Sequence, residues 1–245
     1  MKHRSLMEHE GLQCLNSFFC SYALKGMLAI KEGRTRAKAT TAEYFTQAVY
    51  GRVGELDNTL ASLRLALGFL KALSESADPD PEVYRYHYEN FIFRGIGAVD
   101  RAFLLVADAL QLSNRTRKSN QLIAEQVQGH PQVYAALLAV KATMEAYRKS
   151  RNVVIHDSAY SSRELAVLSG VRQLDLELPG IDVAEVSREA FAAGVQPVAQ
   201  AIGELEASLN TLLGDLKPVF EFVAKWASER YPLCVDIHDS TSKGP

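Results

Sequence analysis

The chain has 245 residues, of which 47% are hydrophobic and 23% charged, as in an ordinary globular protein of one large or two small domains. Its net charge of -2 gives no general attraction to nucleic acid, so any polyanion site must be a local basic patch. The three cysteines, Cys14, Cys20 and Cys234, lack metal-ligand spacing, which favours a reduced, cytoplasmic setting.

The first predicted element is the apolar stretch at residues 12–30. Asn16 and Lys25 interrupt it, and Glu8 and Glu10 precede it, which argues against both a membrane span and a secretory signal. We expect a partly buried helix here, with packing on a partner as the alternative. Residues 1–36 are therefore interpreted as an N-terminal helical extension, and no membrane association is expected.

Three later stretches carry apolar residues at alternating steps of three and four, the spacing of helices packed side by side. Their positions are Val49, Val53, Leu56, Leu60, Leu63, Leu67 and Leu70, then Ile96, Val99, Phe103, Val106 and Leu110, then Val195, Val198, Ile202, Leu205, Leu209, Leu212, Leu216, Val219 and Val223. The pattern predicts an all-α, up-and-down helical bundle over residues 37–238.

Strand-like alternation is nearly absent. The best candidate, residues 173–178, is short and is expected to be a loop or a brief strand. Pro197 and Pro218 lie within the last apolar stretch and predict kinks or breaks there. The polar tail at residues 239–245 is expected to be disordered.

A further helix is predicted from Pro131 to the Asp157-Ser158 pair, and its apolar register places Arg151 on the buried seam. Burying an unpaired charge there would be costly, so a carboxylate, water in a cleft or an anionic ligand must compensate. The planar guanidinium group suits phosphate well. On an ideal helix Arg151 and His156 point roughly 140° apart. Arginine's length, a helix distortion or a second subunit would have to bring them together.

The segment Arg151-Asn152-Val153-Val154-Ile155-His156 resembles the R-N-x-x-x-H motif of the HEPN superfamily. A second segment, Tyr88-Glu89-Asn90-Phe91 with Arg94, Asp100 and Arg101, is similar to an aromatic and acidic helix of bacterial HEPN proteins, among them Cthe_2314-like and toxin-type members. The resemblance implies a core of four or five helices with extra helices around it. It also implies a homodimer and, in many members, a metal-independent endoribonuclease.

The same resemblance implies the division of labour in the site. His156 moves a proton as general base or acid, Arg151 holds the phosphate and stabilises the transition state, and Asn152 orients one of them. RNA would be cleaved by attack of the 2′-hydroxyl, at a site composed from both protomers. By analogy with the family, the protein would serve as a toxin or in phage defence, with a cognate antitoxin or regulatory protein.

Other residues support this hypothesis and leave alternatives open. Arg148 and Lys149 precede the motif and could bind the RNA backbone, while Tyr160 could stack on a base. Glu89, Arg94 and Asp100 either hold Arg151 and His156 in position through contacts with them or form a salt-bridge network between helices. In the structural alternative Arg151 pairs with Glu89 or Asp100. The basic cluster of Arg115, Arg117 and Lys118 is either a second RNA contact or a solvated surface.

Other classes of site lack their sequence motifs. There is no phosphate-binding glycine motif, no H-E-x-x-H and no Cys/His cluster of metal-ligand spacing, so no metal or cofactor is expected. Gly95 and Gly97 fall within a helical pattern and predict close packing. The competing functions are a catalytically inert HEPN-like module that binds nucleotide, RNA or a protein partner, and a helical scaffold without a ligand.

Overall fold

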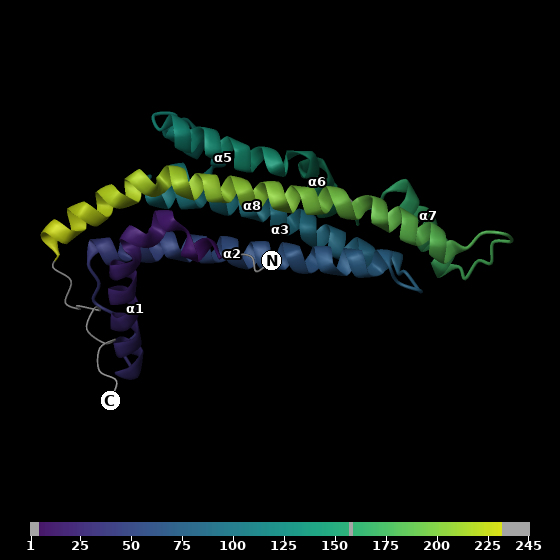
Figure 1. The fold of residues 1–245 in the computed structure, drawn as a ribbon, viewed down its shortest axis with the longest axis horizontal. Helices are drawn as coiled ribbons and strands as arrows, with labels where there is room; N and C mark the ends of the chain where they lie inside the picture. Colours follow the sequence, from purple (N-terminus) through teal and green to yellow (C-terminus); the bar gives the residue numbers. More distant parts are fainter. Residues whose placement is uncertain (1–4, 157–158, 232–245) are drawn as a thin grey trace. The chain divides into compact units, whose positions relative to one another are not determined.

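The computed structural model describes residues 5–156 and 159–231, with the backbone alone for residues 153, 155 and 156. This part of the chain forms α-helices and short 3-10 turns, without a strand (Figure 1). The helices are α1 (Asn16–Lys31), α2 (Thr41–Ser74), α3 (Pro81–Ala109), α4 (Asn120–Val127), α5 (Pro131–Thr143), α6 (Arg148–His156), α7 (Arg163–Gln173) and α8 (Val183–Arg230). The predicted all-α class is confirmed. None of the described helices is long and apolar enough to cross a membrane.

The chain divides into two compact units. Unit 1 comprises the described parts of Met1–Glu55, Phe103–Ala135 and Asn210–Pro245, and unit 2 comprises Leu56–Ala102 and Ala136–Leu209. The long helices α2, α3 and α8 each contribute one segment to each unit. The motif helix α6 belongs to unit 2.

The apolar positions of the long helices form the core, as their spacing predicts. In α2, six of the predicted positions are at most 1% exposed: Val49, Val53, Leu56, Leu60, Leu63 and Leu70. In α8 the predicted positions from Val198 to Leu216 are buried. Beyond Pro218 the buried face shifts, and Phe220 and Ala227 are buried while the predicted Val219 and Val223 are partly exposed.

The two prolines of α8 do not interrupt it, so the predicted breaks are wrong. Pro197 and Pro218 are both exposed. Each proline removes the hydrogen bond to the carbonyl four residues earlier. Those carbonyls belong to Ala193 and Gly214, which are exposed as well, so water can satisfy them.

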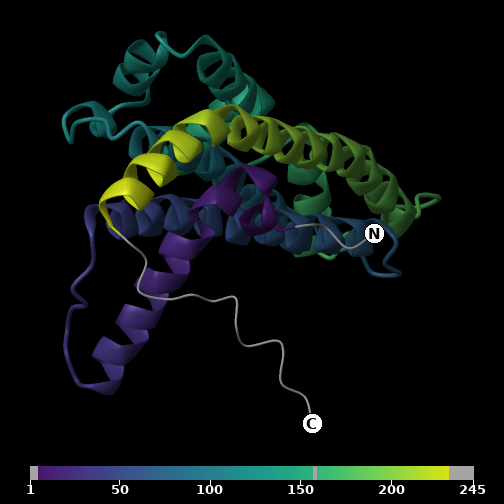
Figure 2. The same ribbon diagram turned by 60° about the vertical axis from the view of Figure 1, so that its left-hand side comes forward.

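In unit 1, α1 lies across the N-terminal end of α2 (Figures 1 and 2). The attachment point is Glu43, which is 2% exposed. Its carboxylate accepts hydrogen bonds from Lys25 at 2.7 Å, Ser21 at 2.6 Å and the backbone N–H of Thr40 at 2.7 Å. The Thr40 hydroxyl in turn accepts from the Glu43 N–H, which completes a capping box at the start of α2.

The basic cluster after α3 is partly structural. Arg117 forms an ion pair with Asp108, a buried carboxylate on α3 in unit 1. Asp108 also accepts from Arg52 of α2 at 3.0 Å. Burial of the carboxylate is offset by these two cations, so Arg117 is engaged in holding the fold.

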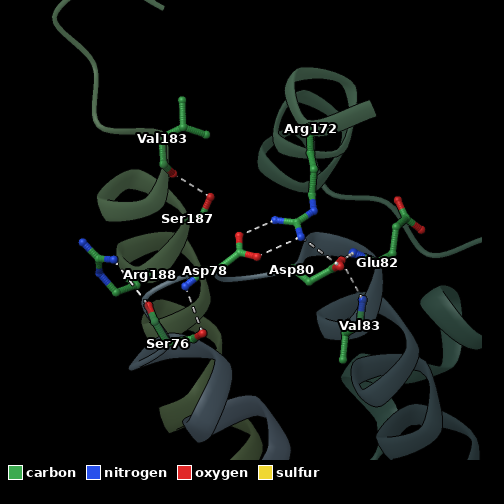
Figure 3. A network of polar contacts seen from close by, with 9 residues as sticks. All are labelled: Ser76, Asp78, Asp80, Glu82, Val83, Arg172, Val183, Ser187 and Arg188. Atoms are coloured by element: carbon green, nitrogen blue, oxygen red, sulfur yellow. Dashed lines mark hydrogen bonds and ion pairs between the residues drawn. The ribbon is translucent and has the colours of Figure 1, made fainter. Parts of the chain in front are cut away.

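In unit 2, a polar network joins the turn between α2 and α3 to α7 and α8 (Figure 3). The Arg172 guanidinium of α7 donates to both oxygens of Asp78, at 2.6 and 3.2 Å, and lies 3.5 Å from Asp80. Asp80 also caps α3 by accepting from the Val83 N–H. Arg188 of α8 donates to the carbonyl of Ser76. The network fixes α7, which lines a cavity discussed below.

Of the segment at residues 173–178, Gln173 is the last residue of α7 and residues 174–178 form a loop without a strand. It follows the end of α7, where the N–H of Leu174 donates to the carbonyl of Gly170. Asp175 then has a left-handed backbone with φ of 48°, which turns the chain and is incompatible with an extended strand.

Candidate functional site

The motif lies on its own short helix. The predicted continuous helix from Pro131 to residue 156 is wrong, because α5 ends at Thr143, a 3-10 turn follows at Glu145–Tyr147, and α6 begins at Arg148. The Thr143 hydroxyl donates back to the carbonyl of Val140 at 2.8 Å. Met144 leaves helical geometry with φ of -112° and is only 1% exposed.

Close packing fixes Met144 at this break. A Cβ on Gly95 of α3 would collide with the end of the Met144 side chain. Because Gly95 has no side chain, it leaves the space that the end of Met144 fills. This agrees with the close packing predicted at Gly95 from the sequence. Because the helix is interrupted here, the apolar register of α5 does not continue into α6.

Arg151 consequently leaves the buried seam on which the sequence pattern placed it. Its side chain is partly exposed, and it makes no hydrogen bond or ion pair with any residue that the structure describes. The Glu89 carboxylate, one of the two alternative partners expected for Arg151, instead accepts a hydrogen bond from the backbone N–H of Tyr160. Asn152 is exposed on the same helix. The backbone of His156 ends α6, while its side chain and Asp157 lie outside the described residues.

One turn of α3 holds both ends of the motif helix. Before α6, the ring of Tyr147 packs edge-to-face on Phe91, with centroids 4.9 Å apart. After α6, Glu89 accepts a hydrogen bond from the backbone N–H of Tyr160 at 2.6 Å. The Tyr160 ring packs on Tyr88 at 4.6 Å. The α3 turn of residues 88–91 thus fixes the entry to and the exit from α6.

The family comparison agrees with this arrangement. The model of the HEPN_Cthe2314-like HEPN family matches residues 32–224, which include α2 to α7 and most of α8. The chain belongs to this family. Neither a search of the curated proteins nor a search of the solved structures finds a match.

Within this HEPN domain, the remaining predicted site residues are dispersed. Arg148 pairs with Glu145 at 3.0 Å, and Lys149 is exposed. Arg94 is exposed and donates to Asn90 on its own helix at 2.8 Å. Asp100 is partly buried on α3. Among the predicted supporting residues, a described hydrogen bond brings Glu89 and Tyr160 together.

Sequence reasoning did not single out Tyr88, Phe91 and Tyr147 as anchors of the HEPN motif. The available signal was the aromatic content of the α3 segment, which the resemblance had already marked. In the sequence, Tyr147 continues the apolar spacing of Val140 and Met144, which is typical of a packed side chain. The ring of Tyr147 does pack, against Phe91, and this contact also fixes the position of the start of α6.

The electrostatics of the anchoring turn are simple. Burial raises the pKa of Tyr88 well above its ordinary value and raises the pKa of Tyr147 as well. Neither phenol can lose a proton near neutral pH, so neither serves there as a general base. The described residues contain no cluster of three or more His, Cys, Asp or Glu side chains able to hold a metal ion.

Proposed function

We propose that this HEPN protein is a metal-independent endoribonuclease that uses Arg151, Asn152 and His156. The observation that carries the proposal is the state of Arg151, which is partly buried on α6 without a described partner. A partly buried guanidinium gains most from an anionic ligand. Exposed Asn152 beside it adds an amide, and the two lie on a helix that α3 anchors at both ends.

The proposed reaction is transfer of the phosphate within one nucleotide. The 2′-hydroxyl attacks the adjacent phosphorus while His156 accepts its proton. The bond from phosphorus to the 5′-oxygen breaks, and that oxygen takes a proton as it leaves. The products are a 2′,3′-cyclic phosphate and a 5′-hydroxyl end. Arg151 stabilises the charge on the phosphate oxygens, and Asn152 orients the phosphate or the imidazole.

Two copies of the chain would complete the site. α6 is a regular helix from Arg148 to His156, and on such a helix Arg151 and His156 point roughly 140° apart. An arginine from one protomer facing a histidine from the other removes this conflict, so we propose a homodimer. Lys149, exposed at the start of α6, would contact the RNA backbone, as would Arg148 once released from Glu145.

The biological setting follows from family analogy. A toxin or phage-defence nuclease held in check by an antitoxin or regulatory protein would act in the cytoplasm. The thiols of Cys14 and Cys20 are free, which suits a reducing compartment. The division into an N-terminal extension at 1–36 and a HEPN domain at 37–238 stays a prediction, and the tail at 239–245 lies outside the described residues.

A catalytically inert binding module is the second candidate. The observation that favours it is the apolar surface of α1, on which Leu24, Met27, Leu28 and Ile30 are between 45 and 72% exposed. Apolar groups gathered on one helix suit a protein partner. In this case RNA or nucleotide would be bound without cleavage.

The test is incubation of mixed RNA with wild-type protein and with His156→Ala in EDTA. His130→Ala is the matched control, because His130 is exposed and precedes α5, far along the chain from the motif. We expect cleavage by wild type and His130→Ala alone, with cyclic phosphate ends. Equal cleavage by His156→Ala would indicate a contaminant or another site. No cleavage by any folded dimer would favour the binding module.

A further inference from the structure

Unit 2 contains a cavity of about 310 Å³ that opens beside the exit from the motif helix. It is enclosed by α3, by the segment after α6, by α7 and by α8. The side chains that define it are Tyr84, Tyr88, Tyr160, Ser162, Glu164 and Phe191. This volume lies at the lower end of the range for small-molecule sites, so the cavity can take one planar ring system rather than a folded partner.

The walls of the cavity are aromatic and tightly fixed. Tyr84 stacks on Phe191 with centroids 4.2 Å apart, and Tyr160 packs on Tyr88 at 4.6 Å. On α8, a Cβ at Gly194 would collide with the Tyr84 hydroxyl. Gly194 therefore leaves the room that the Tyr84 hydroxyl occupies at this wall. Aromatic walls of this kind favour a flat, apolar ligand face.

The polar groups of the cavity are acceptors and neutral hydroxyls. Glu164 is an exposed residue in the first turn of α7 that borders the cavity. Hydrogen bonding from the backbone N–H and from Ser162 lowers the pKa of its carboxyl, so it is charged at neutral pH. Burial raises the pKa of Tyr84 to about 12, so its phenol stays protonated. No Arg, Lys or His occurs among the described lining residues. This environment repels phosphate and selects a neutral ring that donates N–H groups.

The cavity lies close to the motif along the chain. Tyr160, which lines it, follows His156 by four residues. Four residues span at most about 14 Å between Cα atoms. An RNA strand whose phosphate is bound at the motif can therefore place a neighbouring base in the cavity.

We propose that this cavity binds a nucleobase of the RNA next to the scissile phosphate, guanine foremost. Guanine presents two adjacent N–H donors on its Watson–Crick edge, which match the two oxygens of the Glu164 carboxylate. Uracil offers a single donor between two acceptor oxygens and fits poorly. The inference rests on the proposed ribonuclease function for its biological meaning, but nucleoside binding is measurable without it.

The test uses guanosine and uridine as probes, with binding to the full chain followed by ligand-observed NMR. The background is His156→Ala, so that cleavage plays no part. We expect guanosine to bind more tightly than uridine, Glu164→Gln to weaken guanosine about tenfold or more, and Ala190→Phe to abolish binding by filling the cavity. Glu185→Gln is the matched control, because Glu185 is in the first turn of α8 and does not line the cavity.

The outcomes separate the two proposals. Guanosine binding that depends on Glu164 while wild type never cleaves RNA would support the cavity and refute the nuclease. Cleavage with no nucleoside binding, or with binding unchanged in folded Glu164→Gln and Ala190→Phe, would refute the cavity and leave the nuclease intact. Equal binding of guanosine and uridine would overturn the assignment of Glu164 as the selecting group. Circular dichroism checks the folding of each variant.

Discussion

Two arginines of unit 2, on consecutive helices, differ in whether the fold provides them with a carboxylate partner. Arg172 of α7 is exposed, yet it has a bidentate partner in Asp78 and a second carboxylate nearby in Asp80. Arg151 of α6 is more buried and has no partner among the described residues. Exposed ion pairs contribute little stability, while unpaired charges cost more as burial increases. Arg151 is thus the arginine with the greater need for a partner, and the fold does not supply one in the described part of the chain.

Under the proposed function, this contrast separates an arginine that stabilises the fold from an arginine that binds the phosphate of the substrate. Arg172 joins α7 to the turn between α2 and α3, so its partners lie within unit 2 (Figure 3). α6 is held instead through its flanking residues Tyr147 and Tyr160. The motif helix is therefore anchored without using its own arginine, which leaves the guanidinium for chemistry.

The largest expected effect is loss of RNA cleavage in Arg151→Ala. Removing a group that stabilises charge in the transition state lowers kcat by about 100- to 1,000-fold. The melting temperature should be unchanged, because no described contact is lost. Arg151→Lys keeps the charge but loses the bidentate fork, and should recover only part of the activity. A fall in melting temperature as large as that of a core substitution would mark Arg151 as structural and erase the contrast with Arg172.

A smaller effect is expected from the packing that interrupts the helix before α6. Gly95→Ala places a Cβ against the flexible end of the Met144 side chain, which must shift. Overpacking of about 1–3 kcal/mol is partly offset by about 1 kcal/mol of helix propensity, so the unfolding free energy should fall by about 0–2 kcal/mol. Met144→Ala alone should cost about 2–5 kcal/mol through the cavity it leaves. In the double variant the new methyl group at position 95 occupies part of that space. The double variant should therefore lose less unfolding free energy than the two single variants lose in total. Strict additivity in urea unfolding would show that the two residues do not constrain each other.

The sequence predicted the helices, the close packing at Gly95 and the family, because each depends on local spacing or on a short motif. It did not predict the break at Met144, since the apolar spacing through Val140, Met144 and Tyr147 continues a helical register across it. At the break Met144 packs against Gly95 of α3, a contact that local spacing does not encode. The link from Glu89 to Tyr160 joins residues 71 positions apart and likewise depends on tertiary geometry.

Glu89→Gln tests the anchoring of α6 through its exit. The amide keeps an oxygen acceptor for the Tyr160 N–H but loses the charge, so a cost of about 1 kcal/mol is expected, against about 1–3 kcal/mol for Glu89→Ala. Glu89 is a positioning residue, so kcat for RNA should fall while KM changes little. Hydrogen exchange at the Tyr160 amide should be faster in Glu89→Ala than in wild type. In Glu89→Gln the exchange rate should stay close to that of wild type, because the acceptor oxygen is kept. Unchanged exchange in Glu89→Ala would remove Glu89 from this role.

The smallest effect is expected for the other arginine. The hydrogen bond from Arg172 holds the pKa of Asp78 below its ordinary value of 3.8. A carboxylate whose pKa is lowered by folding contributes stability that is present above the unfolded pKa and is lost as pH falls through the folded one. The melting temperatures of wild type and Arg172→Ala should therefore differ slightly at pH 7 and converge below pH 3.8, as Asp78 becomes protonated. Added salt should narrow the same difference at pH 7, because the pair is exposed. If the melting temperatures of wild type and Arg172→Ala still differ in acid, Arg172 stabilises the fold through packing of its aliphatic stem and not through its charge. Arg172 and Arg151 could then no longer be compared as a paired and an unpaired charge.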